Sequence, residues 1–130
     1  MRRLETVALV LLVSLVLAVE ATPVPPLQPL VVGWEQFFML TWEVGERGGK
    51  PVVTGRIYNS WNFAAANMRL LVDELGAAGE IIDQRVGWLG FTLTPGTTAP
   101  FEIPVAHGTP NHRVSVFAFD WVQTNGHRRF

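Results

Sequence analysis

Apolar residues recur at every second position through most of the chain after residue 34, and this period of two constrains the fold more than any other feature. The clearest run places four apolar side chains on one face: Phe38, Leu40, Trp42 and Val44. Clusters of Gly, Pro and Asn interrupt the alternation about every 8 to 12 residues, as turns between short strands do. The sequence therefore predicts an all-β domain.

The alternation and the turn clusters together mark out six segments. We expect strands at residues 36–44, 52–59, 68–75, 80–88, 99–105 and 113–122. The stretch 61–67 contains three alanines, which fits a single helical turn, but a loop that links two sheets fits better between strands. A short amphipathic helix over 67–75 competes with the third strand, because the adjacent Leu70 and Leu71 leave the period ambiguous.

Two of the expected strands carry signs of their position in a sheet. Pro100 and Pro104 fit an edge strand, since proline cannot donate a ladder hydrogen bond. In the last strand Val114, Val116 and Ala118 alternate with Ser115, Phe117, Phe119 and Trp121. Both faces of that strand are apolar, so we expect it to be central. Six or seven short antiparallel strands predict a single two-layer sandwich of immunoglobulin-like or fibronectin-like architecture.

The N-terminal residues, up to Pro29, have the layout of an export signal followed by a linker. The apolar run from Val7 to Val19 would span about 20 Å as a helix, against about 30 Å for the hydrocarbon core of a bilayer. We therefore expect a cleaved signal peptide at 1–21, a Pro-rich linker at 22–33, the sandwich at 34–124 and a C-terminal tail at 125–130. Export predicts a protein of the periplasm or cell surface, and an anchor formed by an uncleaved N-terminal helix is the alternative.

The composition excludes several classes of function. The chain has no cysteine, so disulfides, thiol nucleophiles and thiolate metal sites are impossible. Its net charge of −1 at pH 7 lacks the basic excess that is typical of nucleic-acid-binding domains. The basic residues near the end of the chain, Arg128 and Arg129, fit a frayed terminus better than a binding tail.

The histidines and the adjacent acids do not form a pattern that predicts a metal site or catalysis. His107 and His112 could join Asp120 or Glu102 around a metal ion, but their offset across a Gly-Pro turn is not a usual ligand spacing. We therefore expect no metal site.

The other reactive side chains also lack partners along the sequence. Asp73 and Glu74 would point to opposite faces of a strand, so they cannot act on one bond, and we expect a solvated strand edge there. Lys50 follows two glycines but lacks the spacing of a phosphate-binding loop. Ser60 and Ser115 lie in no nucleophile elbow. We expect neither enzymatic activity nor a cofactor.

Four short segments follow one another in a recurrent order of strands and glycine turns. They are VTGRIYN at 53–59, AGEII at 78–82, LTPG at 93–96 leading to Phe101, and RVSV at 113–116. This order, over about 52–116, resembles the FxLYD domain, a small β-sandwich module of exported and envelope proteins of bacteria. The chain has VDELG at 72–76 where that family has its Phe-x-Leu-Tyr-Asp motif. The resemblance implies a binding or structural module with no enzymatic activity, no cofactor and no catalytic residues.

The five tryptophans are the feature that points to a function. Trp42 and Trp121 lie in strong strands, and we expect both to be buried. Other aromatic residues lie in loops or between glycines, where they can stack on a sugar ring or anchor a protein partner. The candidate binding residues are Trp61, Asn62, Phe63 and Trp88. Alternatively, these rings fold back and close one end of the sandwich.

Together these features predict a non-enzymatic, exported β-sandwich module of the cell envelope that acts through protein–protein interaction or as a scaffold. The alternative is a ligand-binding module, for example for envelope polysaccharide, whose rings would lie coplanar beside Asn62 and Asn67. The expected partner is accordingly an envelope protein or a polysaccharide and not a nucleic acid. Contact with the membrane is expected only through an uncleaved N-terminal segment.

Overall fold

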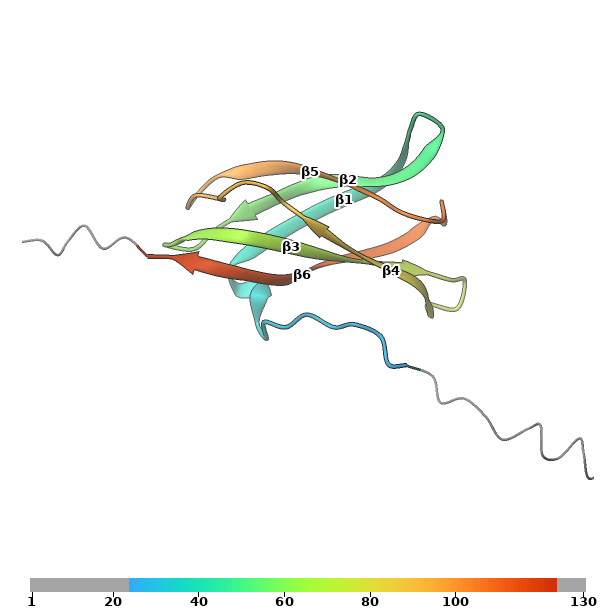
Figure 1. Ribbon diagram of the computed structural model, residues 1–130, viewed down its shortest axis with the longest axis horizontal. Coiled ribbons are helices and arrows are strands. Elements are labelled where there is room, and N and C mark those ends of the chain that lie inside the picture. Colours follow the sequence, from blue (N-terminus) through green and yellow to red (C-terminus); the bar gives the residue numbers. More distant parts are fainter. Residues whose placement is uncertain (1–23, 124–130) are drawn as a thin grey trace, which may run out of the picture.

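The computed structural model describes residues 24–123, which form six strands in two antiparallel sheets of three strands each (Figure 1). The strands are β1 (Phe38–Arg47), β2 (Lys50–Asn59), β3 (Ala64–Leu75), β4 (Ile81–Trp88), β5 (Thr98–Pro104) and β6 (Asn111–Val122). A short 3-10 helix, η1 (Trp34–Gln36), precedes β1. The predicted all-β class is confirmed for this part of the chain.

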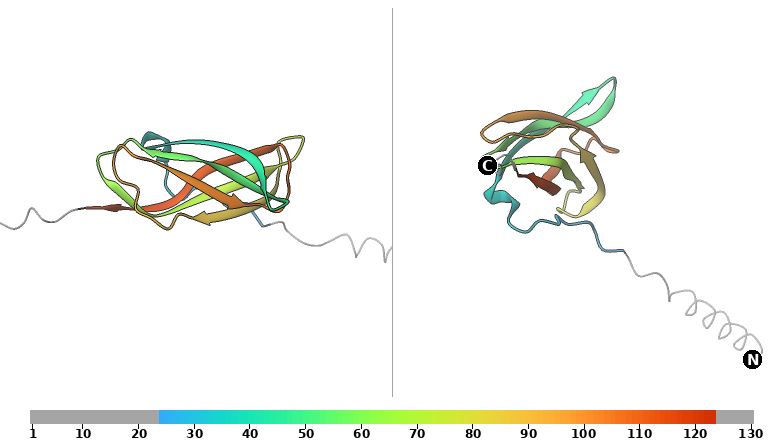
Figure 2. Two further views of the ribbon diagram at one scale, coloured as in Figure 1. Left: turned by 90° about the horizontal axis from the view of Figure 1, so that it is seen from above. Right: turned by 60° about the vertical axis from the view of Figure 1, so that its left-hand side comes forward.

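The two sheets lie one above the other and share one apolar core (Figures 1 and 2). Their strand orders are β1-β2-β5 and β4-β3-β6. The first sheet contributes Phe38, Val53, Ile57, Phe101 and Ile103 to the core, and the second contributes Met68, Leu70, Val72, Val114 and Val116. Because both sheets bury side chains in the same layer, neither sheet has an apolar core of its own.

The third strand begins earlier than the sequence indicates. β3 starts at Ala64, so the loop after β2 shortens to residues 60–63. A helical turn over 61–67 and a helix over 67–75 are therefore both wrong. Ala65 pairs with Trp121 of β6 and forms a bridge with Leu93, and these tertiary pairings outweigh the helix propensity of the alanines.

The predicted position in the sheet is confirmed for β5 and wrong for β6. β5 is an edge strand, as its two prolines predict. β6 is also an edge strand, because it pairs with β3 alone in its sheet, so the expectation of a central β6 is wrong. β3 holds the central position of that sheet.

Two β-bulges explain why both faces of β6 are apolar without the strand being central. Between the pairs Ala66–Asp120 and Arg69–Ala118, β3 contains one more residue than β6, and Asn67 has a left-handed φ of 53° there. Between Arg69–Ala118 and Leu70–Val116, the extra residue is Phe117 of β6. Each bulge reverses which residues face inward. The core side of β6 therefore changes from Val114 and Val116 to Phe119 and Trp121.

The N-terminal segment of the described chain covers the outer face of the β4-β3-β6 sheet, below it in Figure 1. The backbone N–H of Leu30 donates a hydrogen bond of 2.8 Å to the carbonyl oxygen of Phe117. Nearer the start, the backbone of Leu27 exchanges two hydrogen bonds with the side-chain amide of Gln84. These hydrogen bonds attach the segment to β6 at Phe117 and to β4 at Gln84.

The predicted signal peptide at 1–21 and tail at 125–130 lie outside the described residues, and so do positions 22 and 23 of the predicted linker. From residue 24 to residue 123, the structure contains no helix with the length and apolar character needed to cross a membrane. The export prediction stays a prediction.

Candidate functional site

The two ends of the sandwich carry different chemistry. At one end, the loop between β2 and β3 presents the candidate binding residues of the sequence analysis. The side chains of Trp61 and Phe63 are 39% and 44% exposed, and Asn62 between them is exposed as well. We call residues 60–63 the aromatic loop.

A buried asparagine holds the aromatic loop in place. Asn59, the last residue of β2, is fully buried, and its Oδ1 accepts a hydrogen bond of 2.9 Å from the N–H of Trp61. Its Nδ2 donates to the carbonyl oxygens of Phe63 at 2.9 Å and Leu93 at 3.0 Å. The side-chain amide therefore hydrogen-bonds to both ends of the loop and connects the loop to Leu93, which precedes β5.

The rings of the aromatic loop pack edge-on against aromatic residues that lead into the core. Phe37 contacts Trp61 with a centroid distance of 4.8 Å and an interplanar angle of 71°. Phe37 also contacts Trp121 at 5.2 Å, and Phe63 lies 6.2 Å from Trp121. Trp121 is half-buried and packs against the core, so its predicted burial is confirmed only in part. The loop thus folds back in part while each of its rings keeps an exposed face.

Trp88 and Trp42 stand apart from this loop. Trp88 of β4 is 65% exposed, and the guanidinium of Arg69 lies 4.8 Å from its ring centroid. Within residues 24–123, no ring pairing joins Trp88 to Trp61 or Phe63. Trp42 is 38% exposed rather than buried, because it lies on the edge strand β1; its indole Nε1 donates to the carbonyl oxygen of His112.

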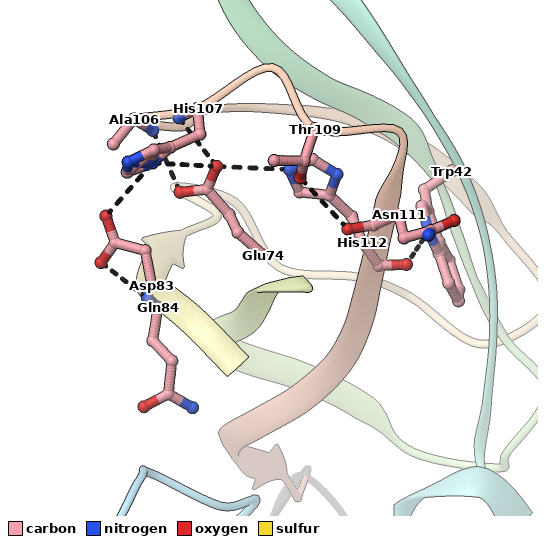
Figure 3. Close-up of polar contacts among 9 residues, drawn as sticks. All are labelled: Trp42, Glu74, Asp83, Gln84, Ala106, His107, Thr109, Asn111 and His112. Carbon is pink, nitrogen blue, oxygen red and sulfur yellow. Dashed lines mark hydrogen bonds and ion pairs between the residues drawn. The ribbon is translucent and has the colours of Figure 1, made fainter. Parts of the chain in front are cut away.

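The opposite end of the sandwich gathers two histidines and two acids, which we call the histidine cluster: Glu74, Asp83, His107 and His112 (Figure 3). Glu74 is 1% exposed and accepts backbone hydrogen bonds from Ala106 at 3.2 Å and His107 at 2.8 Å. Nδ1 of His107 lies 3.8 Å from Glu74 Oε1 and 4.0 Å from Asp83 Oδ2. Nε2 of His112 lies 3.5 Å from Glu74 Oε1.

The histidine cluster corrects the expectation of a solvated Asp73–Glu74 edge. Both side chains are buried, because β3 is the central strand of its sheet. As predicted, the two acids do not converge. Glu74 faces the cluster, whereas Asp73 on the outer face accepts hydrogen bonds from Arg113 and Gln84. Two adjacent acids inside an apolar strand were a signal that both have polar partners elsewhere in the fold.

The acids that the sequence analysis placed beside the histidines lie elsewhere. Arg47 hydrogen-bonds to Glu102, and this bond holds the pKa of the Glu102 carboxyl below its usual value. Asp120 accepts a hydrogen bond of 2.9 Å from the side chain of Asn67. The sequence analysis did not place Glu74 and Asp83 beside the histidines, because these acids lie in β3 and β4, whereas the histidines follow β5 in the chain.

Comparisons with known proteins add little to this description. No protein-family model matches the chain, and no curated protein matches it. The X-ray structure of Northeast Structural Genomics Consortium target SoR45 matches 72% of this chain and 88% of its own, with 14% sequence identity and a TM-score of 0.37. At this level the match says nothing about function.

Proposed function

We propose that this protein is an exported, non-enzymatic β-sandwich module of the cell envelope, of immunoglobulin-like or fibronectin-like architecture and related to the FxLYD domain. In this proposal, it binds an envelope protein through the aromatic loop. The observation that carries the proposal is the partial exposure of Trp61 and Phe63 on a loop that Asn59 holds by three side-chain hydrogen bonds.

A fixed aromatic loop suits a protein partner for energetic reasons. Tryptophan is over-represented among residues that dominate binding energy, because one ring buries a large area at low cost in side-chain entropy. The loop is already ordered by Asn59 and by two hydrogen bonds from Ser60 to the carbonyl oxygen of Phe37. Little conformational entropy is then lost on binding.

The same end of the sandwich is less suited to a sugar ring. A polysaccharide site would use the amide of Asn67 beside a flat aromatic platform. That amide already donates to Asp120. Within residues 24–123 no ring pairing joins Trp61 to Phe63, because Trp61 packs edge-on against Phe37 and Phe63 packs against Trp121. Trp88, the third ring of such a platform, is paired with Arg69 instead. The contacts therefore favour a protein partner over a polysaccharide.

Photo-crosslinking in the producing cell tests this proposal. A photoreactive amino acid replaces Asn62 in the full-length chain, and a matched variant carries it at the exposed Lys50, at the other end of β2. We expect a discrete protein adduct from position 62, weakened by Trp61→Ala, and none from position 50. Equal adducts from both positions, or binding of position 62 to cell-wall glycan alone, would contradict a protein partner.

Export is tested separately by fractionating the cells and measuring the intact mass of the protein. The proposal expects the chain in the envelope or periplasmic fraction, with a mass that lacks residues 1–21. Recovery of the full-length mass in the membrane fraction would instead favour the anchored alternative. Recovery in the cytoplasm would contradict export.

A further inference from the structure

We propose that Glu74, Asp83 and His107 bind a divalent transition-metal ion of the zinc class, with His112 beside them. The three ligands come from β3, β4 and the loop between β5 and β6, and one ligand atom of each lies within 4.8 Å of the others. Figure 3 shows the carboxylates of Glu74 and Asp83 directed at the ring of His107. This proposal is independent of the aromatic loop at the other end of the sandwich.

The distances in the cluster are close to those of a metal site. Zinc binds nitrogen and carboxylate oxygen at about 2.0 to 2.2 Å, so two ligands of a tetrahedral ion lie about 3.4 Å apart. His107 Nδ1 lies 3.8 Å from Glu74 Oε1 and 4.0 Å from Asp83 Oδ2. A small rotation of the imidazole shortens both distances, and the ligand oxygens of Glu74 and Asp83 lie within 4.8 Å of each other. The ring can make that movement, because the His107 side chain is half-exposed.

His112 provides a second, independent observation. Its side chain is fully buried, yet neither of its ring nitrogens has a hydrogen-bond partner among the described residues. Its Nε2 points at the same carboxylate, 3.5 Å from Glu74 Oε1. Buried polar groups without a partner are rare in native proteins, and an ion is one of their recognised explanations. A cation held by Glu74 would lie on the side to which Nε2 of this buried imidazole points, and it would give that nitrogen the partner that it lacks.

The carboxylates are already oriented for binding. The carboxylate of Glu74 accepts hydrogen bonds from the backbone N–H groups of Ala106 and His107. These bonds fix the carboxylate against the loop between β5 and β6. Asp83 Oδ1 accepts a hydrogen bond of 2.8 Å from the backbone N–H of Gln84, which leaves Oδ2 directed to His107. Such outer contacts commonly orient metal ligands and raise affinity.

The ligand types define the class of ion. Imidazole with carboxylates suits Zn²⁺, Ni²⁺, Co²⁺ and Cu²⁺, whereas Ca²⁺ takes six to eight oxygen ligands and Mg²⁺ prefers octahedral oxygen. The cluster has too few oxygen ligands for Ca²⁺ and contains imidazole, so we expect Zn²⁺ to bind and Ca²⁺ and Mg²⁺ not to compete.

Isothermal titration of the full-length protein with Zn²⁺ tests the site. We expect one ion per chain with low-micromolar affinity or tighter, a shift of the His107 ring signals in NMR spectra, and no effect of excess Ca²⁺. His107→Gln and Asp83→Asn change side chains that reach solvent, so both variants should fold. Each should weaken binding at least tenfold.

Matched controls separate this site from general metal binding. Asp120→Asn removes an exposed acid outside the cluster, and His127→Gln removes another imidazole; both should keep the affinity of the parent. Trp61→Ala should keep it too, although it weakens the partner adduct. Equal affinities for the parent, His107→Gln and Asp83→Asn, or binding only at millimolar Zn²⁺, would overturn the proposal.

Discussion

At the residue scale, Asn59 connects the core to the aromatic loop. It is the one buried amide side chain within residues 24–123, and it forms hydrogen bonds with backbone groups of residues 61, 63 and 93. Its own backbone N–H donates to Thr97, and its carbonyl oxygen accepts from Gly96. A single polar side chain thereby fixes the position of the loop.

We predict that Asn59→Ala destabilises the protein by about 2 to 3 kcal/mol, because it leaves buried backbone groups without partners. Acrylamide should also quench Trp61 more readily once the loop is released. Urea unfolding and fluorescence quenching measure the two effects. Ser60→Ala is the control, since Ser60 keeps its backbone bond to Phe37, and it should change stability by less than about 0.5 kcal/mol. Similar losses in both variants would refute the role given to Asn59.

Gly55 in the middle of β2 leaves room for its neighbours. A Cβ at this position would lie 2.0 Å from the carbonyl oxygen of Thr41 and 2.7 Å from Cζ of Phe101. The first of these contacts is with backbone, which cannot move without disturbing the β1–β2 pairing. The absence of a side chain here is therefore a packing requirement.

We predict that Gly55→Ala lowers stability by about 2 to 3 kcal/mol through overpacking. Gly45→Ala in the neighbouring strand is the matched control, because an added Cβ there meets no atom within 4 Å. That variant should have unchanged or slightly higher stability, since alanine restricts the unfolded chain. Thermal unfolding of both variants makes the comparison, and equal melting temperatures would contradict the packing argument.

At the scale of elements, a row of three polar side chains across one sheet holds the N-terminal segment. Gln84, Asp73 and Arg113 are neighbours on β4, β3 and β6. Asp73 accepts from Gln84 at 2.8 Å and from the Arg113 guanidinium at 2.8 and 3.0 Å. Gln84 in turn bonds both backbone groups of Leu27. The buried acid thus orients the glutamine that captures the segment.

We predict that Gln84→Ala releases the start of this segment. The backbone N–H of Leu27 should exchange with deuterium at least about tenfold faster, because its acceptor is lost, while amides inside β3 keep most of their protection. Hydrogen exchange read by NMR measures both. Gln123→Ala changes an exposed glutamine after β6 and should leave Leu27 unaffected. Unchanged exchange at Leu27 in the Gln84 variant would show that other contacts hold the segment.

At the scale of the whole molecule, one core joins the two sheets and separates two chemically different ends. Side chains of β1, β2 and β5 meet those of β3 and β6 in a single layer. The aromatic loop lies where β3 begins, and the histidine cluster lies where β3 ends. The central strand therefore sets the distance between the two proposed binding sites.

We predict that the protein unfolds in a single cooperative transition, because neither sheet can keep its apolar face buried without the other. Tryptophan fluorescence reports on both sheets, because Trp42 lies in β1, Trp88 in β4 and Trp121 in β6. It should give the same urea midpoint as far-UV circular dichroism, which reports on the backbone. Reducing agent should have no effect, since the chain has no cysteine. Two separate midpoints would contradict the single shared core.

Local pattern was enough to predict much of this fold. The alternation of apolar residues identified the strands of the all-β domain, because the side-chain period of a strand is a property of its own backbone. The prolines of β5 marked an edge for an equally local reason, the missing N–H donor. The exposure of Trp61, Asn62, Phe63 and Trp88 also agrees with their expected places in a loop and between glycines.

Tertiary structure alone decided the remaining features. The bulges at Asn67 and Phe117 change which residues face inward, and they arise from the pairing of β3 with β6 rather than from either strand. The same pairing sets Glu74 opposite His112, far away in sequence. Local sequence reports that side chains alternate between the two faces of a strand. The points where a bulge reverses this alternation, and the side chains that a residue meets, depend on sheet pairing across the chain. The histidine cluster could therefore appear only once the strands were assembled.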